Sequence, residues 1–334
     1  MKNSLPLLAI TMGDPAGIGP EIAVRACSRL SAHQLSRILI IGELTILKRW
    51  RDDLCAKLDI NPISAVDQMS RDAINILSLD MIGPSEFAVG KVSAACGKAS
   101  FEYIITAIEL AMQKKIQGVV TCPINKESLH QAGITFPGHT EIFAQYTHTD
   151  DYTMMFLLDD VSVVHVTTHC SLLRALELIR APRVLKNITL LDRALRSMGL
   201  SSPRIAVGGV NPHAGENGLF GREEIDHVIP AMEQARAAGI DVTGPYPPDT
   251  VFMRAFRGEF DGVVSMLHDH GFVALKSRDF ERGVNITIGL PIVRTSVGHG
   301  TAFDIAGQGR ASPQSLLEAI RVGRLLASPP LPGQ

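Results

Sequence analysis

Short β-branched segments alternate with amphipathic helical segments along almost the whole chain, and this alternation restricts the fold more than any other feature. We predict strands over residues 5–11, 37–41, 117–121, 153–158, 162–168, 204–209, 261–267 and 285–290. We predict helices over residues 20–30, 98–115, 140–147, 183–198, 222–238 and 313–327. Strands separated by helices are typical of parallel sheets, so the sequence predicts an α/β architecture.

Composition narrows the class of protein further. The chain has 334 residues, of which 46% are hydrophobic and 20% are charged, with a formal net charge of −2. Two domains with sizeable cores fit this length, and no basic stripe indicates a nucleic-acid partner. The five cysteines form no C-x-x-C pair, and no apolar run approaches the roughly 20 residues of a membrane-spanning helix. We expect a cytoplasmic protein with reduced thiols and no membrane association.

Three histidines, His169, His213 and His268, each follow a predicted strand. In an open α/β sheet, ligands bind outside the carboxyl ends of the strands, where three imidazoles can converge on one metal ion. A catalytic zinc site typically has three protein ligands and one open position. The alternative interpretation is that these are three unrelated polar loop residues.

Two other loops also follow predicted strands. The segment 12–21 is rich in glycine, which lets backbone approach a ligand closely. Pro20 suits the first turn of a helix, and Glu21 suits the helix dipole. The segment is neither a phosphate-binding P-loop nor a dinucleotide fingerprint, so a structural turn and a ligand-facing loop both remain open. Lys126, in the other loop, is a candidate for contact with a ligand.

Several polar residues suit an anionic substrate. Thr140 can cap the helix predicted over 140–147, whose first backbone N–H groups can hold an anion, and His139 can add a donor. Lys276, Asn285 and Arg294 supply cationic and amide donors for phosphate or carboxylate oxygens.

Two acidic residues lie next to the histidines in sequence. Asp269 follows His268 and can orient an imidazole or share the metal. Glu216, in the glycine-rich segment after His213, can hydrogen-bond to a metal ligand and so orient it.

The segment from His299 to Gly309 reads H-G-T-A-F-D-I-A-G-Q-G. It resembles the nucleotide-binding loop of the isocitrate and isopropylmalate dehydrogenases, H-G-[ST]-A-x-x-x-A-G-x-x, which cradles the adenosine half of the dinucleotide. This resemblance explains why a dinucleotide-binding protein lacks the G-x-G-x-x-G fingerprint. It implies the following cofactor-binding residues: His299, Gly300, Thr301, Ala302, Asp304 and Gly307.

Taken in order from Gly13 to Gly309, these motifs resemble the 4-hydroxythreonine-4-phosphate dehydrogenase (PdxA) family. The resemblance implies a two-domain α/β/α sandwich of the isocitrate/isopropylmalate dehydrogenase type. It also implies a homodimer with active sites near the subunit interface. We place one domain at residues 1–125 plus 285–334 and the second at 126–284, with the active site in the cleft between them.

The resemblance also assigns roles to residues. It implies that His169, His213 and His268 bind a divalent metal, with one ligand from the partner subunit. The positions that match substrate-binding residues are His139, Thr140, Lys276, Asn285 and Arg294. Zinc is the expected metal, with Mn, Co, Ni, Fe and Mg as alternatives, and NADP is an alternative to NAD. Asp269 and Lys276 are the catalytic candidates, while Asp269, Lys126 and a metal-bound hydroxide are alternatives for the general base.

Some residues depart from the commonest pattern of the pyridoxal-pathway enzymes. The chain has His270 where H-D-Q-G is frequent, Cys122 where T-G-P is frequent, and Phe272 and Ala274 in place of leucine and proline. These changes resemble paralogues that act on threonate or erythronate 4-phosphate.

The expected function is therefore metal- and NAD-dependent oxidation of a phosphorylated 3-hydroxy acid with loss of CO2. The substrate is either 4-phosphohydroxy-L-threonine, as in pyridoxine biosynthesis, or a threonate or erythronate 4-phosphate. One alternative is a dehydrogenase of the cis-dihydrodiol of terephthalate, because the same donors can hold carboxylates. Another is a metal-binding or nucleotide-sensing protein that has kept the fold without catalysis.

Overall fold

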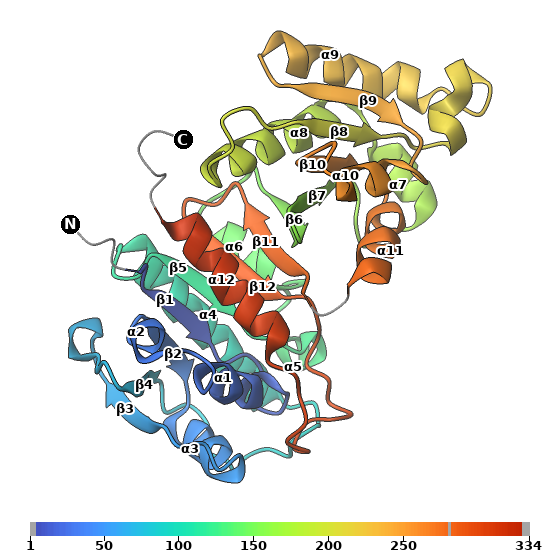
Figure 1. The fold of residues 1–334 in the computed structure, drawn as a ribbon. Helices are drawn as coiled ribbons and strands as arrows, with labels where there is room; N and C mark the ends of the chain where they lie inside the picture. The colour runs from blue at the N-terminus through green and yellow to red at the C-terminus, as the bar shows by residue number, and fades with distance from the viewer. Residues whose placement is uncertain (1–4, 280–281, 329–334) are drawn as a thin grey trace. The chain divides into compact units, whose positions relative to one another are not determined.

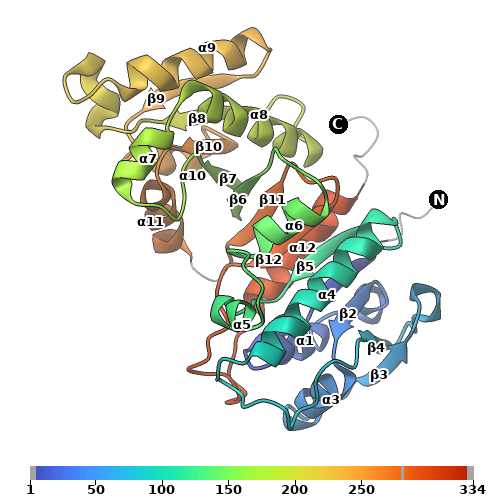
Figure 2. The same ribbon diagram turned by 180° about the vertical axis from the view of Figure 1, so that it is seen from behind.

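The computed structural model describes residues 5–279 and 282–328, which form two compact units (Figures 1 and 2). Unit 1 comprises Met1–Asp150 and Leu290–Ser328, and unit 2 comprises Asp151–Gly289. The boundaries differ from the predicted 125/126 and 284/285. Residues 126–150 belong to unit 1 because their two helices pack on a long helix of that unit, and residues 285–289 belong to a strand of unit 2. Residues 1–4 and 329–334 of the predicted first domain lie outside the described residues.

Unit 1 contains a parallel sheet of six strands. In spatial order these are β3 (Asp59–Ile63), β4 (Ala73–Ser78), β2 (Ile38–Gly42), β1 (Leu8–Thr11), β5 (Gly118–Thr121) and β12 (Val293–Val297). The three inner strands β2, β1 and β5 are buried along their whole length. Short apolar runs with no polar face are what a parallel sheet covered on both sides requires.

Helices cover both faces of this sheet. They are α1 (Gly19–Cys27), α2 (Ala32–Leu35), α3 (Leu44–Asp53), α4 (Ala94–Met112), α5 (Lys126–Gln131), α6 (His139–Tyr146) and α12 (Gln314–Ala327). Helices α1 and α12 lie on one face, while α4 and α6 lie on the other (Figures 1 and 2). The unit is therefore an α/β/α sandwich, as predicted.

Unit 2 contains a mixed sheet. In spatial order its strands are β11 (Val284–Ile288), β6 (Thr153–Leu158), β7 (Val161–His165), β10 (Gly262–Ser265), β8 (Ile205–Gly208) and β9 (Val242–Tyr246). The expectation of a purely parallel arrangement is wrong here, because β6 is antiparallel to both β7 and β11. Only two residues separate β6 from β7, which allows a hairpin but not a crossover. From β7 to β9 the strands are parallel.

The helices of unit 2 are α7 (Leu172–Leu178), α8 (Ala181–Ser197), α9 (Ile229–Ala237), α10 (Val251–Phe256) and α11 (His268–Arg278). One core cluster joins α10 and α11 to one face of the sheet through Phe252, Phe272, Val163 and Val263. Gly262 precedes Val263 on β10 and therefore faces the other side of the sheet. A Cβ atom on Gly262 would contact Leu191 and Leu195 of α8, so α8 covers that opposite face. Within the described residues, no helix combines the length and the apolar character needed to cross a membrane.

Every predicted helix and strand is present, with ends that shift by a few residues. The run 162–168 is one example, because its strand ends at His165. The prediction missed β3, β4, β9 and β12 and the shorter helices α2, α3, α5, α7, α10 and α11. Two of the missed strands, DINPI and VTGPY, contain proline, lie at the edges of their sheets and have only one fully buried residue each.

Candidate active site

A buried arginine is the centre of a polar pocket in unit 1. Arg294 lies on β12 and is 3% exposed, and its Nη2 atom donates a hydrogen bond to Thr121 Oγ1 at 2.8 Å. Its guanidinium carbon lies 5.6 Å from the centre of the Phe143 ring. Burial lowers the pKa of Arg294 to about 9, and the nearby charge of Glu141 offsets part of this change. The guanidinium therefore keeps its positive charge at neutral pH in surroundings with little water.

His139 begins α6 beside this arginine. Burial, and then the charge of Arg294, hold the pKa of His139 well below its usual range. The imidazole is therefore neutral at pH 7 and can donate one N–H group. Its Nε2 atom is buried and has no hydrogen-bond partner among the described residues. A ligand oxygen that reached this atom would satisfy a buried polar group.

The start of α6 differs from the predicted cap. The helix begins at His139 with Gly138 as its N-cap residue, and no side chain caps it. Thr140 is therefore in the first turn and is not the cap, because the helix starts one residue earlier than predicted. The uncapped N–H groups of a first turn attract anions. Lys126, at the start of α5, lies next to this turn, because a Cβ atom built on Gly138 would be 3.9 Å from Lys126 Cε.

The three histidines follow the carboxyl ends of three neighbouring parallel strands in unit 2, namely β7, β10 and β8. The rings of His169 and His268 are 5.6 Å apart, whereas His213 lies 6.2 Å from the ring of Phe220. The structure thus brings two of the three together and places the third at the same end of the sheet. Among the residues described, no group of three His, Cys, Asp or Glu side chains is arranged to hold a metal ion.

His268 has a fixed orientation. Its Nδ1 atom lies 2.7 Å from Asp269 Oδ1, which leaves Nε2 to face a ligand. A carboxylate that holds one ring nitrogen in this way is the usual support of a metal-binding histidine. Phe272 contacts the His268 ring at 4.6 Å and stacks on His165 at 4.5 Å, with an interplanar angle of 3° for the His165 pair.

His213 lies on a strained backbone. All five residues from His213 to Asn217 have positive φ angles, between 44° and 81°. Left-handed backbone costs roughly 1–2 kcal/mol for each residue other than glycine, and such strain is concentrated at functional sites. The strain therefore supports a functional role for this turn.

Glu224, which the sequence analysis missed, anchors this turn. It is 2% exposed, and its Oε1 atom accepts hydrogen bonds from the backbone N–H groups of Val210 at 2.7 Å and Asn211 at 2.8 Å. Its Oε2 atom accepts a third bond from Asn211 Nδ2 at 2.9 Å. The predicted supporting residue Glu216 is exposed. Glutamate inside a predicted helix gives no sign in sequence that it is buried.

The two remaining predicted substrate-binding residues also lie in unit 2. Lys276 is exposed on α11, the helix that begins with His268, and its Nζ atom is 5.2 Å from the centre of the Phe272 ring. Asn285 is half-buried on β11, opposite Phe156 of β6.

The segment from His299 to Gly309 lies in unit 1 and packs on the glycine-rich loop before α1. The backbone N–H of Ile18 donates to Thr301 O at 3.1 Å, and a Cβ atom on Gly17 would be 3.0 Å from the Thr301 side chain. Thr301 is 8% exposed, whereas Asp304 is exposed. Ala302 has a φ of 44°, which is unusual for a residue with a side chain. The structure therefore gives the predicted cofactor loop a defined shape within a single unit.

Comparison with solved structures identifies the class of protein first. The fold is similar to that of a beta-decarboxylating dehydrogenase from Thermococcus kodakarensis, with a TM-score of 0.50 at 12% identity over 95% of this chain and 81% of the other. At that identity only the fold is shared, and it is the isocitrate/isopropylmalate dehydrogenase type predicted from the sequence.

The family follows from closer matches. Residues 34–323 match the family model described as pyridoxal phosphate biosynthetic protein PdxA. The chain is 46% identical to D-threonate 4-phosphate dehydrogenase of Cupriavidus necator, over 98% of this chain and 99% of that protein. It is 42% identical to 4-hydroxythreonine-4-phosphate dehydrogenase of Desulforapulum autotrophicum, over 98% and 97%. The chain therefore belongs to the PdxA family, as the motifs indicated.

Solved structures agree with this assignment. The crystal structure of 4-hydroxythreonine-4-phosphate dehydrogenase from Klebsiella pneumoniae has a TM-score of 0.88 and 43% identity, covering 96% of this chain and 99% of that one. A terephthalate 1,2-cis-dihydrodiol dehydrogenase from Burkholderia xenovorans is less similar. Its TM-score is 0.67 and its identity 30%, over 96% and 98% of the two chains.

Proposed function

We propose that this protein oxidises the secondary alcohol of D-threonate 4-phosphate, or of the related 4-hydroxythreonine 4-phosphate, with NAD as the hydride acceptor. The observation that carries this proposal is the buried Arg294, with Thr121 and His139 beside it, in unit 1. The names of the relatives at 42–46% identity support a phosphorylated hydroxy acid as the substrate.

The pocket suits a phosphate group for physical reasons. Arg294 is a buried cation, and a guanidinium forms strong, frequently bidentate hydrogen bonds with phosphate oxygens. The neutral imidazole of His139 adds an uncharged donor, and the first turn of α6 adds backbone N–H groups. Lys126 brings a second positive charge to the same turn.

The histidine edge of unit 2 has the chemistry of a divalent-metal site. His169, His213 and His268 would hold the metal, and the contact of Asp269 with His268 Nδ1 supports that role for His268. Zinc is the metal we favour, and Mn, Co, Ni, Fe and Mg are alternatives. When bound, such a metal supplies Lewis acidity, which lowers the pKa of the substrate hydroxyl.

Two groups of the chain then complete the reaction. We assign the adenosine half of the dinucleotide to the segment from His299 to Gly309, and the nicotinamide half would receive the hydride from the carbinol carbon. The hydroxyl proton would pass to a lysine, Lys126 or Lys276, because Asp269 is already bonded to His268. The resulting β-keto acid loses CO2, with the electron pair of the broken C–C bond passing to the ketone as an enolate.

We also propose that the active form is a homodimer. Large apolar side chains are exposed beside two of the metal-binding histidines: Leu172 and Leu173 near His169 are 69% and 71% exposed, and Leu219 near His213 is 73% exposed. Exposed apolar groups at one sheet end favour burial against another surface. A second copy of the chain on this face would account for the incomplete metal site within one chain.

The test is formation of NADH by the metal-loaded protein, measured with four substrates in parallel. These are D-threonate 4-phosphate, 4-hydroxythreonine 4-phosphate, unphosphorylated D-threonate and the terephthalate dihydrodiol. We expect turnover of a phosphorylated acid and rates at least about a hundredfold lower without the phosphate. Turnover of the dihydrodiol alone would contradict the proposal.

A further inference from the structure

Two side chains of α1 hold the far end of the predicted cofactor segment. Glu21 Oε1 accepts a hydrogen bond from the backbone N–H of Ala311 at 2.8 Å. One turn later on the same helix, a guanidinium N–H of Arg25 donates to the carbonyl oxygen of Gly309. The two side chains also pair with each other, Arg25 Nε to Glu21 Oε1 at 3.0 Å. Residues 309–311 are therefore tied to α1 by a side-chain pair.

Burial of Glu21 is not explained by stability. The residue is 0% exposed, and its Oε2 atom has no hydrogen-bond partner among the described residues. A buried carboxylate with an unsatisfied oxygen is destabilising relative to an apolar side chain of similar size. We infer that the glutamate is needed for the contacts of its other oxygen, Oε1, with the backbone N–H of Ala311 and with Arg25.

The near end of the segment is tied to the same part of the chain. Ile18 N donates to Thr301 O at 3.1 Å, just before α1 begins. Between the two ends the segment contains only turns, such as those from Ala302 O to the N–H groups of Ile305 and Ala306. The positive φ angle of Ala302 is held in place by these surroundings. The middle of the segment packs on residues 89–90, since a Cβ atom on Gly307 would be 3.1 Å from Val89 Cγ1, and the anchors fix its two ends.

We propose that Glu21 and Arg25 are positioning residues that hold residues 299–311 in the shape that receives the dinucleotide. This inference rests on the proposed function, in which that segment binds NAD. The two residues act through the segment and do not themselves contact the reacting atoms.

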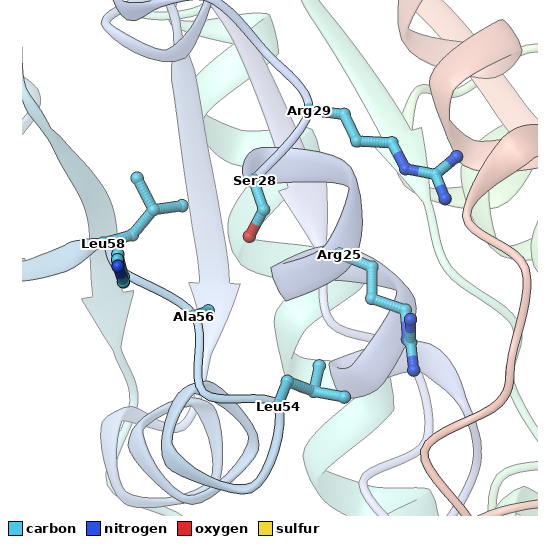
Figure 3. A pocket seen from close by; sticks show the side chains of 7 residues that line it. Arg25, Ser28, Arg29, Leu54, Ala56 and Leu58 are labelled. Carbon is cyan, nitrogen blue, oxygen red and sulfur yellow. The ribbon is translucent and has the colours of Figure 1, made fainter.

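Arg25 also faces a cavity, which suggests a control. A cavity of about 360 Å³ is lined by Arg25, Arg29 and Lys57 together with Leu54 and Leu58 (Figure 3). Arg29 contributes a cation from the turn that follows α1. If Arg25 acted only through its positive charge, Arg29→Gln would raise the KM for NAD as much as Arg25→Gln does.

The experiment compares the full-length, metal-loaded wild-type protein with the variants Glu21→Gln, Arg25→Gln and Arg29→Gln. We expect the KM for NAD to rise about tenfold in Arg25→Gln, with a smaller fall in kcat, because Glu21 loses its cation and Gly309 its donor. We expect amide hydrogen exchange in residues 299–311 to accelerate in both Glu21→Gln and Arg25→Gln. Arg25→Lys, which keeps the charge and can reach one acceptor, should restore part of the affinity.

The outcomes separate this inference from the proposed function. A wild-type protein that forms no NADH with any of the four substrates would overturn the proposed function. A wild-type protein that does form NADH, together with variants that keep its KM for NAD and its exchange rates, would overturn the positioning role alone. Equal effects of Arg29→Gln and Arg25→Gln would also overturn it, because charge and not anchoring would then explain the result.

Discussion

The polar residues around Arg294 in unit 1, proposed as a phosphate pocket, and the histidine edge of unit 2 are built in opposite ways. In the pocket, Arg294 and Thr121 are buried and bonded to each other, and His139 is held neutral beside them. At the histidine edge, His169 and His213 are exposed, and only His169 and His268 are neighbours. A hydrogen bond within one unit joins Arg294 to Thr121, whereas the proposed metal site would require further groups.

This difference indicates a division of roles. A preorganised cationic pocket binds its anion without rearrangement, so it serves recognition. A site made of exposed imidazoles on strained backbone gains order when a metal, a substrate or a second chain arrives. We therefore expect changes at the three histidines to affect turnover and changes at Arg294 to affect substrate affinity.

The largest effect should come from the variant His268→Ala, which removes the histidine whose Nδ1 atom lies 2.7 Å from Asp269 Oδ1. We expect NADH formation to fall about a thousandfold or more, because activation of the hydroxyl is lost. Binding of D-threonate 4-phosphate, measured by calorimetry, should change little. As a control, the exposed His33 in unit 1 should tolerate alanine without loss of rate. Equal loss of binding and turnover would contradict the division of roles.

A second variant, Arg294→Met, removes the cation of the pocket. We expect kcat/KM for the phosphorylated substrate to fall about a hundredfold or more, mainly through KM, because the phosphate loses a buried charged partner. The fold should persist, since methionine fills similar space without a buried charge. Arg324, another buried arginine of unit 1, provides the matched control, because Arg324→Met should leave KM unchanged. A fall in kcat with constant KM would instead place Arg294 in the chemistry.

Glu224→Gln should loosen the left-handed turn that carries His213. We expect metal affinity, measured by competition with a chelator, to fall about tenfold. Hydrogen exchange should accelerate in residues 210–217, because two backbone N–H groups lose a charged acceptor. Glu216→Gln, on the exposed side of the same turn, should have no effect. Unchanged affinity in Glu224→Gln would show that the turn does not depend on this anchor.

The smallest effect concerns pH and the neutral imidazole in the pocket. Because the pKa of His139 lies well below 6.5 in the folded protein, the unfolded chain binds a proton below pH 6.5 that the folded chain does not. The free energy of unfolding should therefore fall as the pH drops from 6.5. In His139→Gln this fall should be smaller by about 1 kcal/mol per pH unit. Parallel denaturation profiles of the two proteins would contradict burial of a neutral imidazole.

Much of the fold was predictable because its inner strands are short apolar runs, such as ILIIG and GVVT, which have no other stable place in an α/β protein. The antiparallel strand β6 was not predictable from periodicity, because apolar runs look alike in both directions. Edge strands such as DINPI carry too little apolar character to be detected.

The positions of the three histidines just after strands were predictable, because residue type and strand ends coincide there. Arg294 was expected past a strand end, but it lies within β12, which the prediction missed. Burial was not predictable, because Glu21 and Glu224 are glutamates within helical patterns and resemble solvated residues in sequence. Only the structure shows that each accepts backbone hydrogen bonds from a distant segment. The sequence could not show that His169 and His268 are close together, because their closeness depends on β7 and β10 lying side by side.

The most direct test of the central claim is calorimetric titration of D-threonate 4-phosphate into the metal-free protein, with Arg294→Met measured alongside. The structure predicts that the metal-free wild-type protein still binds this ligand, with a Kd within about tenfold of the metal-loaded value, and that Arg294→Met binds it at least about a hundredfold more weakly. Loss of binding on metal removal, with Arg294→Met equal to the wild type, would contradict recognition of the phosphate by the pocket of unit 1.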